Sequence, residues 1–169
     1  MYQTPPVPEG WHGRNLVRIV DPAGLAMAWV SPQHAGAIVS FLSRITPDVP
    51  WITVIQASAD PASAPAILFD RVGGGVPVWM AIPEWDLVRR DPTSLTVGDA
   101  NGLVTIECAC EPGQIRIHAS WTRDLRLTGR LSFDIKDATW QRSIDTSIIR
   151  TERSIELLLF HAEEAIAID

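Results

Sequence analysis

Residues 138–168 read ATWQRSIDTSIIRTERSIELLLFHAEEAIAI and govern the expected architecture. Apolar positions in this segment recur at steps of three and four. At about 3.6 residues per turn they fall within an arc of about 100° on one side of a helix. The stripe consists of Trp140, Ile144, Ile148, Thr151, Ile155, Leu158, Leu159, Ala162 and Ile166. The spacing predicts a long C-terminal helix that lies across the rest of the chain.

The predicted helix is less regular in its first half than in its second. Isoleucine and threonine, which are mediocre helix formers, crowd residues 144–151, so a shorter helix capped by Thr151 is the alternative. Large apolar residues also lie opposite the main stripe, namely Ile149, Leu157 and Phe160. We interpret them as the second contact surface of a two-sided helix, and scattered exposed hydrophobic residues are the alternative.

The N-terminal half predicts two strands and a helix after an irregular lead-in at 1–13. The strands, at 15–20 and 25–30, flank the turn sequence Asp21-Pro22-Ala23-Gly24. Ser31 offers an N-cap oxygen, Pro32 suits the first helical position, and an apolar stripe follows. These features predict a helix at 32–45.

Further strands are expected along the rest of the chain. A β-branched run predicts one at 51–58, and a glycine run at 73–75 predicts a hairpin of 66–72 with 76–82. Residues 83–90 suggest one short helical turn that Pro92 ends. The cleanest alternation of apolar and polar residues, at 125–136, predicts an antiparallel strand with one solvent-exposed face.

Residues 104–110 and 115–121 predict a hairpin whose register can be assigned. Pro112 and Gly113 occupy the central positions of a type II turn, which places Glu111 opposite Gln114. That register places alternate residues on an apolar face, namely Val104, Ile106, Cys108, Cys110, Ile115, Ile117, Ala119 and Trp121. The opposite, polar face carries Thr105, Glu107, Arg116, His118 and Ser120.

Together these elements predict an α+β fold. We expect a curved antiparallel sheet of about six to eight strands, with the early helix and the long C-terminal helix packed on one side. The element order resembles the helix-grip folds of the START and Bet v1 type. The resemblance is one of element order alone and implies no residue roles.

Composition bounds the class of function. The 169 residues fit a single domain, expected at 14–169, and a net charge of -6 disfavours nucleic-acid backbones as partners. The first residues lack a basic start and an apolar core, and no apolar run approaches the ~20 residues that span a bilayer. We therefore expect a cytoplasmic protein with no membrane partner.

Few residues suggest chemistry. Cys108 and Cys110 could share a metal, but the register places them among apolar residues, so we expect core cysteines and neither metal nor cofactor. Glu107 and His118 face each other and would form a general acid/base pair, or merely a cross-strand charge pair. No nucleophile is identifiable beside them, so no catalytic residue is assigned. Arg116, Arg126 and Arg130 would make this face a contact for anions or acidic proteins.

Three functions remain open. The first is a non-enzymatic interaction module, such as an adaptor, an immunity-type protein or an assembly subunit. It would use the two-sided helix and the polar sheet face, and would bind a protein partner or itself. The second is a carrier or sensor of a small apolar ligand with a helix-grip-like cavity lined by Ile67, Phe69, Trp79, Ile117 and Trp121. The third is an enzyme that uses Glu107 and His118.

Overall fold

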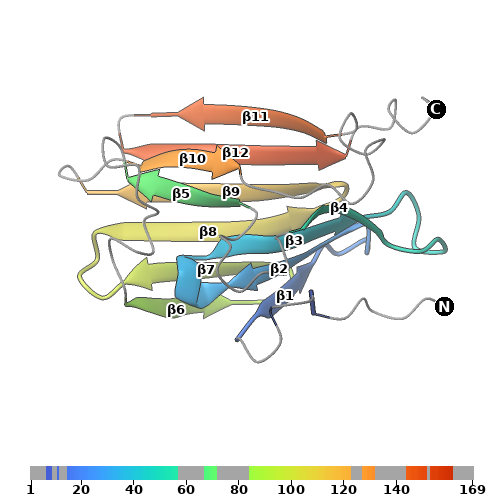
Figure 1. Cartoon of the computed structure of the whole chain (residues 1–169), viewed down its shortest axis with the longest axis horizontal. Coiled ribbons are helices and arrows are strands. Elements are labelled where there is room, and N and C mark those ends of the chain that lie inside the picture. The colour runs from blue at the N-terminus through green and yellow to red at the C-terminus, as the bar shows by residue number, and fades with distance from the viewer. Residues whose placement is uncertain are drawn as a thin grey trace.

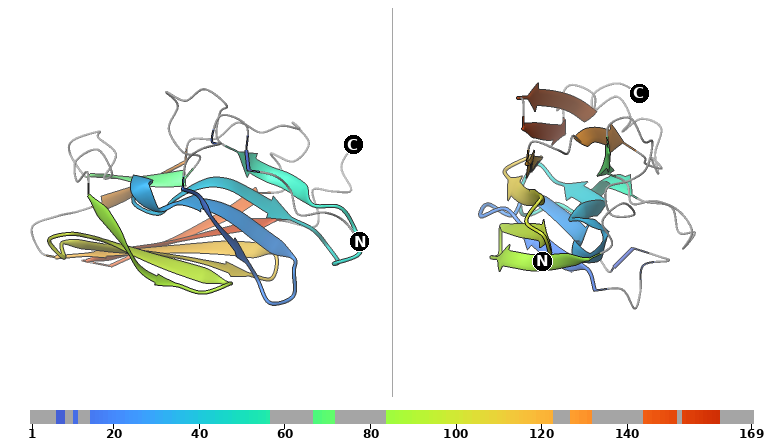
Figure 2. Two further views of the ribbon diagram at one scale, coloured as in Figure 1. Left: turned by 90° about the horizontal axis from the view of Figure 1, so that it is seen from below. Right: turned by 90° about the vertical axis from the view of Figure 1, so that its left-hand side faces the viewer.

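The computed structural model describes residues 7–8, 11, 15–56, 67–71, 84–122, 127–131, 144–151 and 153–161. These residues form two antiparallel sheets that pack face to face, as Figures 1 and 2 show. Within this part of the chain the one helical element is a short 3-10 helix, η1 (Pro32–His34). The described residues contain no helix with the length and apolar character needed to cross a membrane.

Sheet A has six strands in the order β1-β2-β3-β5-β10, with β4 paired to β3 beside β5. Its strands are β1 (Val17–Val20), β2 (Ala26–Ser31), β3 (Ala37–Ser43), β4 (Ile52–Gln56), β5 (Ile67–Arg71) and β10 (Leu127–Leu131). The β1–β2 hairpin was expected from the sequence. The predicted partner of β5, at 76–82, lies outside the described residues.

Sheet B also has six strands, in the order β11-β12-β9-β8-β7-β6. Its strands are β6 (Trp85–Arg90), β7 (Ser94–Asp99), β8 (Val104–Glu111), β9 (Gln114–Trp121), β11 (Ile144–Arg150) and β12 (Ser154–His161). Consecutive strands of this sheet are mostly joined as hairpins, so that β9 lies between β8 and β12 (Figure 1).

The predicted C-terminal helix is wrong. The described part of its segment forms the β11–β12 hairpin, in which Thr151 N donates to Ser154 O at 2.9 Å and closes the turn. The β-branched residues at 144–149 favour a strand, and burial alternates from Ser154 to Leu158 with the period of two of a sheet. The apolar residues recurred at steps of three and four by chance, because two successive strands were interpreted as one helix.

The predicted helix at 32–45 is also wrong. After η1, Ala35 and Gly36 adopt positive φ values of 60° and 70°, which ends the helical turn. All seven residues of β3 are buried, and β3 is a central strand that pairs with β2 on one side and with β4 and β5 on the other. A strand covered on both faces is apolar throughout, and such a run imitates a helical stripe.

Two further predictions that involved helices are also wrong. The short helical turn predicted at 83–90 is strand β6, an edge strand of sheet B. The α+β class and the likeness to helix-grip folds are wrong as well, because both required a long helix packed on a single curved sheet.

The β8–β9 hairpin confirms the register derived from its turn. Glu111 pairs with Gln114, Glu107 with His118 and Cys108 with Ile117. Gly113 has a φ of 73°, as the third residue of a type II turn requires. The predicted apolar face is buried without exception, and the residues of the other face are half-buried or exposed.

A single apolar core fills the space between the sheets. From sheet A it takes Val17, Ile19, Ala26, Ala28, Val30, Ile38, Val39, Phe41 and Val54. From sheet B it takes Leu95, Val97, Val104, Ile106, Cys108, Cys110, Ile115, Ile117, Ala119, Trp121, Ile155 and Leu157. Trp11 is only 2% exposed and packs edge-on against His34, so it closes one part of this core.

The two sheets make a close contact where Gly36 meets β7 and β8. A Cβ atom at Gly36 would lie 3.1 Å from Val97 Cγ2, 3.6 Å from Ile106 Cγ2 and 3.8 Å from Cys108 Sγ. The thiol of Cys108 donates to Gly36 O at 3.1 Å across the same contact. Position 36 therefore needs a glycine both for its backbone conformation and for its space.

A pair of glycine substitutions separates these two requirements. Gly36 and Gly102 share a φ of 70°, but nothing lies within 4 Å of a Cβ at Gly102. We expect Gly102→Ala to lower the free energy of unfolding by about 1 kcal/mol through backbone strain alone. Gly36→Ala should cost about 1–3 kcal/mol more through overpacking, measured by denaturant unfolding. Equal losses in the two variants would contradict the close sheet-to-sheet contact.

Candidate functional site

The outer face of sheet B, turned away from the core, carries the polar side chains of its central strands. Alternation places these residues opposite the core positions on β7, β8, β9 and β12. The half-buried or exposed members are Ser94, Thr96, Thr105, Glu107, Ala109, Glu111, Gln114, Arg116, His118, Ser120, Ser154, Glu156 and Leu158. We call this set the outer face of sheet B.

A Glu-His-Glu row crosses the middle of this face. Glu107 on β8 and Glu156 on β12 are both directly opposite His118 on β9. Directly opposed residues have Cβ atoms about 4.5–5.5 Å apart, so two carboxylates flank one imidazole. All three side chains are half-buried. Within the described part of the chain, neither carboxylate forms an ion pair.

This row can act in binding or in proton transfer. Proton-transfer chemistry would need a reacting group beside His118. Among the described residues no cluster of three or more His, Cys, Asp and Glu side chains is arranged to hold a metal ion.

Arg116 is held at one end of the face by its own hairpin. Its guanidinium forms an ion pair with Glu111, and Gln114 donates to the other oxygen of the same carboxylate. This cluster neutralises Arg116, whereas neither Glu107 nor Glu156 has an ion-pair partner among the described residues. The charge that the outer face offers to a partner is therefore mainly negative.

The residues predicted as an interface do not form one surface. Leu157 lies in the core and is 1% exposed, one position out of phase with Glu156 and Leu158. By register Ile149 is opposite Glu156 and Phe160 is opposite Gln114, so both positions fall on the outer face of sheet B, whereas Arg130 pairs with Leu68 in sheet A. Arg126 lies outside the described residues. Arg116 and His118 do share the outer face of sheet B.

The residues predicted to line a ligand cavity belong to different layers. Ile117 and Trp121 lie in the core, only 2% and 7% exposed. Ile67 and Phe69 belong to β5 in sheet A, and Trp79 lies outside the described residues. Their role in ligand binding stays a prediction that the described structure does not favour.

Cys108 and Cys110 are free cysteines buried under sheet A. Their thiols donate to backbone carbonyls there, Cys108 to Gly36 O and Cys110 to Ile19 O at 3.6 Å. Burial, with a smaller contribution from the charge of Glu107, raises the pKa of the Cys108 thiol to about 12. Burial, and then the charge of Asp21, raises the pKa of Cys110 as well. Both residues therefore stay as neutral thiols at physiological pH.

Thiol labelling tests this packing. In the native protein at pH 8, we expect an aromatic disulfide reagent to leave Cys108 and Cys110 unmodified, because the thiolate is scarce and the reagent has no access. Both should react once the protein is unfolded in guanidinium chloride. Thr105→Cys, an exposed position on the same strand, provides the control that reacts at once. Equally fast native labelling in the parent protein would contradict the buried placement.

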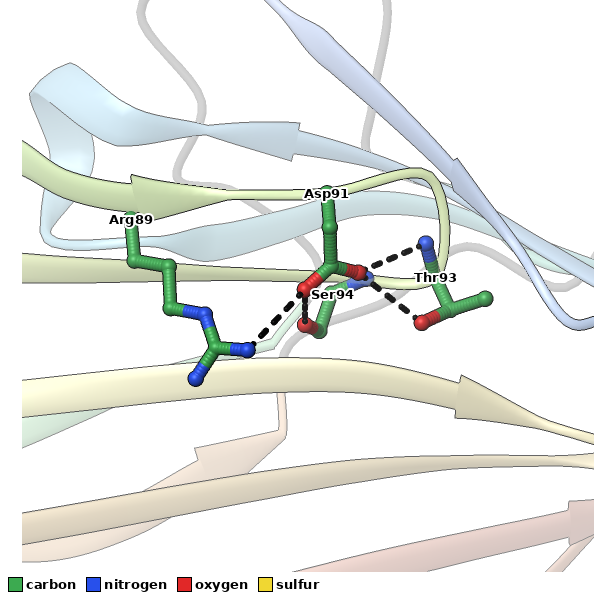
Figure 3. Close-up of polar contacts among 4 residues, drawn as sticks. All are labelled: Arg89, Asp91, Thr93 and Ser94. Atoms are coloured by element: carbon green, nitrogen blue, oxygen red, sulfur yellow. Dashed lines mark hydrogen bonds and ion pairs between the residues drawn. The ribbon is translucent and has the colours of Figure 1, made fainter.

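The turn between β6 and β7 is organised by Asp91, as Figure 3 shows. One carboxylate oxygen accepts from Thr93 N at 3.0 Å, Thr93 Oγ1 at 2.9 Å and Ser94 N at 3.0 Å. The other accepts from Ser94 Oγ at 2.9 Å and lies 3.7 Å from an Arg89 guanidinium nitrogen. Hydrogen bonds from Ser94 and Thr93 hold the pKa of Asp91 below its ordinary value.

The lowered pKa of Asp91 predicts a dependence of stability on pH. Because the folded pKa lies below the unfolded value of 3.8, the carboxylate stabilises the fold above that pH. This contribution is lost as the pH falls through the folded pKa. We expect Asp91→Asn to lower the thermal midpoint at pH 7, and the difference from the parent to shrink below about pH 4. Asp86→Asn, at an exposed position on β6, is the control, and a difference that stays constant with pH would contradict the assignment.

Sequence reasoning missed Glu156 and Asp91. Glu156 was assigned to a helix, although the alternation Ser154, Ile155, Glu156, Leu157 would have placed it on the polar face of a strand. Asp91 was missed because Pro92 was treated only as the end of a helical turn. The sequence Asp91-Pro92-Thr93-Ser94 is a typical Asx turn, in which the aspartate accepts from the residues two and three positions on.

Comparison with known proteins gives no relative. No family model matches the chain, and neither the curated proteins nor the solved structures contain a significant match. The function must therefore be argued from the geometry alone.

Proposed function

We propose that this protein is an interaction module that binds a protein partner through the outer face of sheet B. The observation that carries the proposal is the Glu-His-Glu row, with two carboxylates that form no ion pair among the described residues. The row lies on β9 and its two neighbours, so three adjacent strands present it on one rigid surface.

The charge of this face indicates the chemistry of the partner. Glu111 neutralises Arg116, so Glu107 and Glu156 set the local charge, in agreement with the net charge of -6 for the chain. Complementary charges across an interface accelerate association and exclude wrong partners. A partner with a basic surface patch fits this arrangement, and Leu158, half-buried opposite Arg116, offers an apolar contact beside it.

The proposed setting is the cytoplasm. Cys108 and Cys110 are free and lie on one strand at positions where both side chains point into the core. Unpaired thiols are typical of a reducing compartment. This supports, as part of the same proposal, an intracellular partner.

Photo-crosslinking in the host cell tests the proposal. A photoreactive amino acid at Thr105, exposed on the outer face, should capture a protein with a basic surface. Glu107→Lys combined with Glu156→Lys should abolish the crosslink, because two attractive charges become repulsive and each costs about 1–3 kcal/mol of binding. The captured protein is identified by mass spectrometry.

A matched control separates this face from overall charge. Asp48→Lys with Glu84→Lys changes the net charge by the same amount at exposed positions away from the row, and should leave the crosslink intact. Crosslinking that survives the charge reversal in the row would contradict the proposal. So would equal loss in the two double variants, or no crosslink from Thr105 at all.

A further inference from the structure

A second site lies at the rim where the two sheets meet, away from the Glu-His-Glu row. Arg18 and Val20 on β1 face Arg90 at the end of β6, and Asp91 and Pro92 in the following turn complete the lining. Together they enclose a partly open groove of about 520 Å³. That volume lies within the range of sites that bind small organic molecules.

The groove has a fixed framework. Val20 N donates to Pro92 O at 2.9 Å, which ties the free edge of β1 to the β6–β7 turn. Cys110 N donates to Thr93 O at 2.9 Å, which ties the same turn to β8. Asp91 holds the turn from inside through Thr93 and Ser94 (Figure 3). A site preorganised in this way loses little freedom when a ligand binds.

Two positive charges in the groove have no partner among the described residues. The guanidinium groups of Arg18 and Arg90 are exposed and form no ion pair or hydrogen bond there. The acidic group beside them is already engaged, since Asp91 accepts four hydrogen bonds from Thr93 and Ser94 and pairs with Arg89. Figure 3 shows Arg89 reaching this carboxylate.

The charges of the groove therefore favour an anion. Arg89 offsets the carboxylate of Asp91, which leaves Arg18 and Arg90 as two like charges lining one small space. An oxyanion in this space is attracted by both charges. Guanidinium groups also offer paired N–H donors that match the oxygens of a carboxylate or phosphate.

We infer that this groove binds a small organic oxyanion, a carboxylate or phosphate attached to a compact apolar group. The oxyanion lies between Arg18 and Arg90, and the apolar group contacts Val20 and Pro92. The inference is independent of the protein-binding face proposed above, because the two surfaces share no residue. The chain thus presents a negative site for a protein partner and a positive site for a small ligand.

Nuclear magnetic resonance of the arginine side chains tests this site in the full chain. Phenyl phosphate and benzoate serve as probes for the two oxyanions, inorganic phosphate as the anion without an apolar group, and benzyl alcohol as the neutral analogue. We expect saturable shifts of the Arg18 and Arg90 Nε–H signals with at least one aromatic anion, at a Kd of about 5 mM or tighter. Inorganic phosphate should bind more weakly, and benzyl alcohol should not bind.

Variants locate the binding. Arg18→Gln and Arg90→Gln should each weaken the binding of the preferred probe about tenfold or more, because each removes a charge-assisted contact. Arg153→Gln, an exposed arginine in the β11–β12 turn, removes the same charge elsewhere and should leave the affinity unchanged. Circular dichroism in the near ultraviolet confirms that each variant is folded.

Three results would overturn the inference. The first is that neither aromatic anion saturates the signals at concentrations up to about 20 mM, because a site with the expected Kd would be mostly occupied there. The second is an unchanged affinity in the Arg18 and Arg90 variants. The third is an equal shift of the Arg153 signal, which would show general attraction of anions to exposed arginines.

Discussion

The close approach of Gly36 to β8 is the constraint on which the sandwich depends. At that point a backbone carbonyl of sheet A accepts from the thiol of Cys108, and three side chains of sheet B surround the missing Cβ. The core-facing positions of β7 and β8 at this contact must therefore carry small or apolar side chains, as Val97, Ile106 and Cys108 do. Because side chains alternate along a strand, the positions between them must face away from the core. Glu107 and His118 owe their place on the outer face to this requirement.

Aspartates fix the turns of three hairpins, β1–β2, β6–β7 and β7–β8. Asp21, 3% exposed, accepts from the backbone N–H groups of Ala23, Leu25 and Ala26 in the β1–β2 turn. Asp99, 6% exposed, accepts from Asn101 N and Val104 N between β7 and β8. Asp91 performs the same role between β6 and β7, where its turn also bonds to β1. The anion groove is thus a by-product of how the turns are closed.

The sequence determined the parts of the fold in which a turn set the register. Pro112 and Gly113 admit one turn type, so every pairing from Val104 to Trp121 followed from them. The hydrophobic pattern led to wrong predictions wherever apolar residues were too dense to show the period of a strand. The residues of β3 are buried on both faces, so no alternation was visible there. In the β11–β12 hairpin, the apolar residues of two successive strands together had the spacing of a helical stripe. The candidate sites were likewise predictable only in part. The pairing of Glu107 with His118 followed from the turn, whereas the places of Glu156 and Arg18 depend on contacts between segments distant in sequence.

The distribution of ion pairs explains how one acidic chain presents two sites of opposite sign. Glu111 and Arg116 neutralise each other within a hairpin, and Asp91 and Arg89 do so within a turn. Such pairs contribute little to stability when exposed, but they remove charge from the surface. Glu107 and Glu156 on the outer face, and Arg18 and Arg90 at the rim, are left without an ion-pair partner among the described residues. Local pairing, rather than the net charge of -6, therefore decides which ligand each surface attracts.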